Sequence, residues 1–129
     1  MSKKLARIVF LDDNDDLREL MSLLLAATLG EECRCFDNVM EFQNHLDEIL
    51  RATVVILDIN LGRNTPDGVD AFHWLRERGF RGKVLFFTGH ARTNPQLRSA
   101  ETKGATILEK PLNPEKLVSI VKHALGESA

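Results

Sequence analysis

Two uninterrupted apolar runs, each ended by aspartate, constrain the fold of this chain most strongly. Ile8–Leu11 is followed by Asp12 and Asp13, and Val54–Leu57 is followed by Asp58. An apolar run of this length that a charge ends is typical of a buried parallel strand with a polar tip. Ligand sites of open α/β sheets lie just beyond the carboxyl ends of the strands. Three carboxylates that converge there repel one another, so the pattern predicts a bound hard divalent cation.

Strand-like and helix-like segments alternate along the whole chain. The expected strands cover residues 7–11, 32–36, 53–58, 83–88 and 105–109. Five strands alternating with five helices predict right-handed crossovers and a parallel sheet with helices on both faces. The first, third and fourth strands are the most apolar and belong in the middle, which the order 2-1-3-4-5 satisfies. We therefore expect a flavodoxin-like (βα)5 three-layer sandwich, with Asp12, Asp13 and Asp58 side by side.

Each expected helix begins with a recognisable cap or turn residue. The starts are Asn14, Asn38, Asp67-Gly68, Asn94-Pro95 and Asn113-Pro114. Asn accepts a hydrogen bond at a helix start, and proline suits the first helical position. The first helix should bury Leu17, Leu20, Met21 and Leu24 and end at Gly30. The second should run unbroken from Asn38 through Leu50.

Composition indicates an ordinary globular protein. With 129 residues, 28% charged and 43% apolar, the chain fits one domain over residues 1–129. A net charge of -2 argues against non-specific binding of nucleic acid. No apolar run is long enough to cross a bilayer, and the run after Lys3 and Lys4 is too short for a signal peptide. A cytoplasmic location is the expectation.

Cys33 and Cys35 are the only cysteines, and on a strand they point to one face. Their spacing is poor for a disulfide, and they supply at most two of the four ligands of a zinc site. We interpret them as small residues that are buried or half-buried.

Two further polar groups end strands at the same edge of the predicted sheet. The fourth strand ends at Thr88, and the fifth is followed by Lys110. Phosphoryl transfer requires an oxygen nucleophile, a Mg²⁺ ion and donors that hold the equatorial oxygens. Asp58 could attack, Asp12 and Asp13 could hold the metal, and Thr88 and Lys110 could contact the phosphoryl oxygens.

These motifs resemble the receiver domain of two-component response regulators over essentially the whole chain. The matching stretches are Leu11-Asp12-Asp13-Asn14, Leu57-Asp58, Asp67-Gly68, Thr88-Gly89 and Lys110-Pro111. None is specific alone, but their order on consecutive strand ends is.

The resemblance implies a chemistry and its residues. Asp58 would be the phosphoacceptor, and Asp12, Asp13, Asp58 and the backbone carbonyl of Asn60 would bind Mg²⁺. Thr88 and Lys110 would contact the acyl phosphate, and the Lys110-Pro111 bond would be cis.

The resemblance also implies a signalling role. The donor would be a histidine kinase or a phosphotransfer protein. The product, a 4-aspartylphosphate, would switch the face formed by the fourth helix, fifth strand and fifth helix toward a downstream protein target. The domain would assist its own phosphorylation and dephosphorylation without being an enzyme. It would bind neither nucleic acid nor membrane directly, as a monomer or weak dimer.

One position departs from the family pattern. Ile107 stands three residues before the lysine, where many members carry Tyr or Phe, and its stiff side chain has no hydroxyl. Two other functions compete with signalling: a small aspartate-nucleophile phosphohydrolase and an unphosphorylated pseudo-receiver that only binds partners. A phosphohydrolase usually carries its nucleophile on the first strand, and the complete acid, threonine and lysine set argues against a pseudo-receiver.

Overall fold

The computed structural model describes residues 6–58, 68–89 and 95–126, with side chains of 95–97 excepted. In this part of the chain five parallel strands form one sheet in the order β2-β1-β3-β4-β5. The strands are β1 (Ile8–Leu11), β2 (Cys33–Phe36), β3 (Val54–Asp58), β4 (Lys83–Thr88) and β5 (Thr106–Glu109). The predicted fold class and strand order are confirmed.

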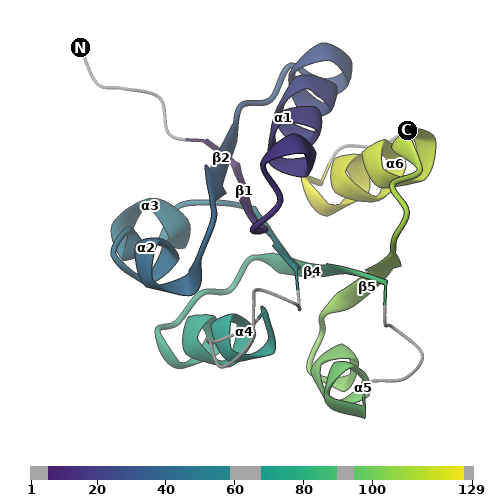
Figure 1. Ribbon diagram of the computed structural model, residues 1–129. Coiled ribbons are helices and arrows are strands. Elements are labelled where there is room, and N and C mark those ends of the chain that lie inside the picture. Colours follow the sequence, from purple (N-terminus) through teal and green to yellow (C-terminus); the bar gives the residue numbers. More distant parts are fainter. Residues whose placement is uncertain (1–5, 59–67, 90–94, 127–129) are drawn as a thin grey trace.

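Six helices cover the two faces of the sheet in the described residues (Figure 1). They are α1 (Asp15–Leu29), α2 (Val39–Gln43), α3 (Leu46–Leu50), α4 (Gly68–Glu77), α5 (Pro95–Thr102) and α6 (Pro114–Ala124). Helices α1 and α6 lie on one face, and α2, α3, α4 and α5 lie on the other. Right-handed crossovers explain this arrangement. The connection from β1 to β2 runs one way along the sheet and places α1 on one face, whereas the connections from β2 through β3 and β4 to β5 run the other way and place α2, α3, α4 and α5 on the opposite face.

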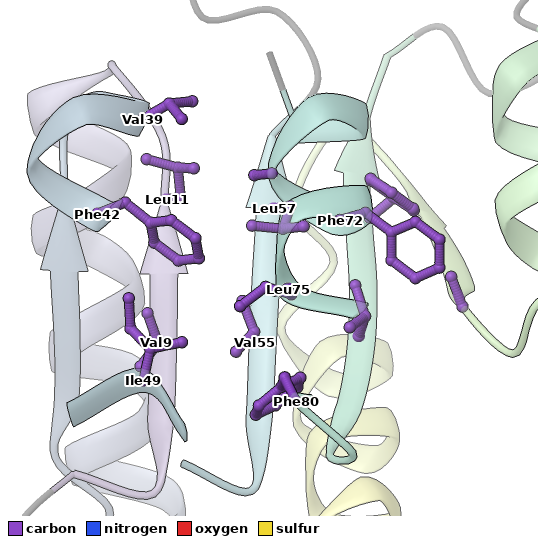
Figure 2. Packing of buried hydrophobic residues seen from close by; sticks show 14 of the residues in the cluster. Val9, Leu11, Val39, Phe42, Ile49, Val55, Leu57, Phe72, Leu75 and Phe80 are labelled. Atoms are coloured by element: carbon purple, nitrogen blue, oxygen red, sulfur yellow. The ribbon is translucent and has the colours of Figure 1, made fainter. Parts of the chain in front are cut away.

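Residues of the central strands alternate between two apolar clusters. On β3, Val54 and Ile56 pack toward α1 and α6, whereas Val55 and Leu57 pack toward α2, α3 and α4. Figure 2 shows the second cluster, in which Phe42 of α2 and other side chains from the helices meet the strands. Strands buried on both faces explain why the sequence reads as continuous apolar runs.

Three of the five predicted helix starts, Asn14, Asn38 and Asn113, are confirmed as side-chain caps, and Asp67 and Asn94 lie outside the described residues. Asn14 Oδ1 accepts a hydrogen bond from the backbone N–H of Leu17 over 2.9 Å, and Asn38 and Asn113 make the equivalent bonds on α2 and α6. Gly30 ends α1 in the left-handed conformation, with φ of 66°.

Two helix predictions were wrong. The segment expected as one helix through Leu50 is broken at Asn44 and His45 into α2 and α3. The His45 ring accounts for the break, because its Nδ1 bonds the Glu41 carbonyl over 2.8 Å and its ring packs on Phe36 at 5.1 Å. On α1, Leu20 is 48% exposed, and the buried residues are Met21 and Leu25. Leu20 lies about 100° around the helix from Met21, outside the stripe that meets the sheet.

Candidate functional site

The register of the sheet brings the aspartates together. Leu11 pairs with Leu57, so Asp12 follows β1 at the level where Asp58 ends β3. Asp12 is completely buried, Asp58 is 3% exposed and Asp13 is exposed. One carboxylate oxygen from each of the three lies within 4.8 Å of the others. Asp12, Asp13 and Asp58 are called the acidic cluster below.

Lys110, the residue directly after β5, contacts two members of the acidic cluster. Its Nζ lies 3.3 Å from Asp12 Oδ2 and 3.3 Å from Asp58 Oδ1. The lysine backbone is fixed by its N–H, which donates to the Thr88 carbonyl over 2.8 Å. The Lys110-Pro111 peptide is cis, as the family resemblance implied. One ammonium therefore faces two buried carboxylates, and the local charge remains negative.

Helix α1 fixes Asp12. The backbone N–H of Asn14 donates to Asp12 Oδ1 over 3.0 Å, and the Arg18 guanidinium donates to the Asp12 carbonyl over 2.7 Å. The Asp12 N–H donates to the Phe36 carbonyl at the end of β2, over 3.1 Å. Arg18 was not among the residues that we predicted. Its position on the first turn after the acid pair is the only sequence signal for it.

Thr88 is fully buried at the end of β4, next to the acidic cluster in the sheet. Thr88 directly follows Phe87, the residue that pairs with Asp58, and successive residues of a strand point to opposite faces of the sheet. The structure brings Asp12, Asp13, Asp58 and Lys110 together at the carboxyl ends of the strands, and Thr88 ends the neighbouring strand β4. Asn60, expected to offer a carbonyl ligand, lies outside the described residues.

The donor set suits a hard divalent cation. Mg²⁺ prefers oxygen ligands at about 2.1 Å, which separates ligands on opposite sides of the ion by roughly 4.2 Å. The oxygens of the acidic cluster lie within 4.8 Å of one another, so a small closing movement would suffice. Three carboxylates against one ammonium leave the excess negative charge that such an ion would neutralise.

Comparisons with known proteins agree with this geometry. The family described as "Response regulator receiver domain" matches residues 8–122. The chain belongs to this family. Receiver domains are phosphorylated on aspartate, bind Mg²⁺ through acidic residues, and interact with histidine kinases or phosphotransfer proteins and with downstream effectors.

Individual relatives are distant in sequence. This receiver is 28% identical over 119 residues to the regulatory protein AtoC of Escherichia coli, and 26% identical over 125 residues to the tetrathionate response regulatory protein TtrR of Salmonella typhimurium. These alignments cover 92% and 97% of this chain but 25% and 59% of the relatives. The chain thus spans only part of the length of the curated relatives it matches.

Solved structures show the same fold. The receiver domain of NtrX from Brucella abortus superposes with a TM-score of 0.80 at 25% identity, covering 94% of this chain and 99% of that one. The beryllofluoride-activated NtrC4 receiver domain dimer gives a TM-score of 0.77 at 25% identity, covering 93% and 96%. In the described part of this receiver, no helix has the length and apolar character needed to span a bilayer.

Proposed function

We propose that this receiver is a Mg²⁺-dependent phosphoacceptor switch, with Asp58 as the phosphorylated residue. The observation that carries the proposal is the position of Lys110 Nζ, 3.3 Å from the buried Asp58 and 3.3 Å from Asp12. A lysine side chain beside a nearly buried carboxylate is placed to stabilise the negative charge of an incoming phosphoryl group. Residues 1–129 would form this single domain.

In the proposed reaction, a carboxylate oxygen of Asp58 attacks the phosphorus of a phosphohistidine on a histidine kinase or phosphotransfer protein. A P–O bond forms, the P–N bond breaks, and the imidazole nitrogen leaves with the electron pair. Asp12, Asp13, Asp58 and the Asn60 carbonyl would hold Mg²⁺, which supplies positive charge to the phosphoryl oxygens. Lys110 and Thr88 would each donate a hydrogen bond to those oxygens.

The switch would act through the face formed by α5, β5 and α6. Phosphorylation adds charge and acceptor oxygens next to β4 and β5, and drawing Thr88 and Lys110 toward them would shift the balance of this face. Ile107 of β5 packs half-buried against the cluster that contains Ala100 of α5. Because Ile107 is no aromatic rotor, the response would depend on movement of α5 itself.

The test is phosphorylation by a small acyl phosphate. Acetyl phosphate with Mg²⁺ should add the mass of one phosphoryl group to the wild type and to the control Asp16→Asn. Asp58→Asn should gain nothing, because an amide is no nucleophile here. A wild type that binds Mg²⁺ but gains no mass would contradict the proposal, and steady turnover of a phosphomonoester would favour a phosphohydrolase instead.

Movement of the α5–β5–α6 face has its own measurement. Beryllium fluoride with Mg²⁺ should mimic the phosphoryl group, and hydrogen exchange in residues 95–109 should change relative to Mg²⁺ alone. An unchanged exchange pattern, with fluoride complex formation shown by mass or NMR, would contradict this part of the proposal.

A further inference from the structure

The two cysteines lie together on the edge strand of the sheet. Cys33 and Cys35 are both half-buried on β2, and they pack on the side of the sheet covered by α1 and α6. Their Sγ atoms are 3.9 Å apart. Alternate residues of a strand point to the same face of the sheet, and the side-chain positions of these two bring their thiols into contact.

The surroundings of the two sulfurs differ. Cys35 Sγ lies 3.3 Å from the Ser22 hydroxyl and 3.9 Å from the Arg18 carbonyl, both on α1. The hydrogen bond between the two thiols lowers the pKa of Cys35 most, burial opposes this effect, and Ser22 and the charges of Arg18 and Arg34 lower the pKa further, to about 6. The same hydrogen bond and burial raise the pKa of Cys33. Of the two thiols, Cys35 is therefore the more acidic.

The residue that pairs with Cys35 on β1 is Phe10, which adds no charge to this environment. A partly exposed thiolate beside a second thiol is the arrangement found in oxidant-sensitive cysteines, which use the neighbour to resolve the first product.

We propose that Cys33 and Cys35 form an oxidant-sensitive dithiol site that hydrogen peroxide converts reversibly into an intrachain disulfide. This site is separate from the phosphoacceptor chemistry, and neither depends on the other.

The reaction takes two steps. Cys35 sulfur attacks one peroxide oxygen, so that an S–O bond forms and the O–O bond breaks, and the departing hydroxide takes up a proton to become water. Cys33 sulfur then attacks Cys35 sulfur; the S–S bond forms, the S–O bond breaks, and a second water leaves with the proton of Cys33. Two thiols lose two electrons and two protons, and one peroxide becomes two waters.

The strand can accommodate this bond at some strain. Residues two apart on a strand have Cα atoms roughly 6.6 Å apart, at the upper end of the range that disulfides span, but their Cβ atoms are about as far apart, beyond the usual range of about 3.5–4.5 Å. The strand must therefore bend locally for the bond to form, which is why the spacing alone is poor for a disulfide. Among the strands that the structure describes, β2 is at the edge of the sheet and pairs with β1 alone, so it can bend more easily than a central strand. A strained disulfide is readily reduced, which makes the modification reversible.

The experiment exposes the reduced, folded protein to increasing hydrogen peroxide, followed by denaturation, alkylation and mass spectrometry. Both thiols should disappear together, with the loss of two hydrogen atoms and no covalent dimer, and dithiothreitol should restore both. A peptide covering residues 31–37 is the unfolded comparison and should react more slowly. Disulfide-linked dimers, independent oxidation of single thiols, or a rate no greater than that of the peptide would overturn the proposal.

Single variants assign the two roles. Cys33→Ser should stop at a sulfenic acid on Cys35 that dimedone traps, whereas Cys35→Ser should leave Cys33 at least about tenfold less reactive. Trapping mainly on Cys33 would overturn the assignment. If either variant fails to fold by circular dichroism, limited alkylation of the wild type, mapped by peptide, gives the same ranking; equal labelling of both cysteines would then overturn it.

Discussion

Lys110 Nζ lies 3.3 Å from Oδ1 of Asp58, although the two residues are 52 positions apart in the sequence. The lysine side chain is 30% exposed and the aspartate side chain 4% exposed, so the ammonium approaches the carboxylate from the solvent side. This pairing gives Lys110 two opposing effects: it stabilises the acidic cluster in the absence of metal, and it competes with a metal for the same oxygens.

Replacing Lys110 with alanine should therefore separate metal binding from phosphorylation. We expect Mg²⁺ affinity to stay the same or to rise, because a competing cation is gone. Phosphorylation by acetyl phosphate should slow by about 10²-fold, the usual effect of removing one donor that stabilises developing charge. Isothermal titration and intact mass measure the two quantities. Lys103→Ala, an exposed lysine beyond α5, is the control, and weakened Mg²⁺ binding in Lys110→Ala would contradict this account.

Mg²⁺ should stabilise the folded protein through the acidic cluster. At a hundredfold excess over Kd the free energy of unfolding should rise by about 2.7 kcal/mol. Asp13→Asn should lose this gain and be more stable than the wild type without metal, because one of three like charges is removed. Urea unfolding with and without Mg²⁺ measures both effects.

Asp16→Asn is the matched control for this experiment, since Asp16 is an exposed acid on the first turn of α1, three positions after Asp13, and is not part of the acidic cluster. It should keep the stabilisation by Mg²⁺. An equal loss in both variants would mean that Mg²⁺ acts through general charge screening.

The cap of α1 should influence metal binding as well as stability. Asn14→Ala removes the hydrogen bond to Leu17 and should cost about 1 kcal/mol, and Asn113→Ala should cost a similar amount on α6. Only the change at Asn14 should weaken Mg²⁺ binding, because loss of the cap loosens the turn whose backbone N–H at position 14 holds Asp12 Oδ1. Thermal unfolding and Mg²⁺ titration of the two variants test this, and equal Mg²⁺ affinities would contradict it.

Alkylation of Cys35 should follow an acidic pH profile. The lowered pKa means that the reactive thiolate persists to low pH, so the rate with iodoacetamide should be half-maximal near pH 6. Cys33→Ser should move the midpoint upward, because it alters the hydrogen bond between residues 33 and 35 that lowers the pKa of Cys35 most. A midpoint near 8.5, the ordinary thiol value, would contradict the prediction.

The sequence predicted correctly those features that depend on the residues of a single short segment. Continuous apolar strands, asparagine caps and Gly30 predicted the elements and the order of the sheet. Asp12, Asp58 and Lys110 were placed correctly because parallel strands bring their carboxyl ends to one edge.

The errors arose where tertiary contacts decide. The apolar spacing from Val39 to Ile49 continues across the break at His45, so periodicity alone could not reveal it. Leucines lie on most sides of α1, so the sequence alone does not show which side is buried. In the structure, Met21 and Leu25 are the residues buried against the sheet. The thiol contact likewise depended on side-chain placement that spacing does not give.

The acidic cluster combines Asp12 and Asp13 with Asp58, which lies 45 positions after Asp13, so no short peptide of this chain holds all three carboxylates. Affinity for the ion therefore belongs to the assembled sheet and should vanish cooperatively with it. Titrating denaturant against a bound Mn²⁺ probe would follow folding and ligand release as a single transition, so the site itself serves as a reporter of the native state.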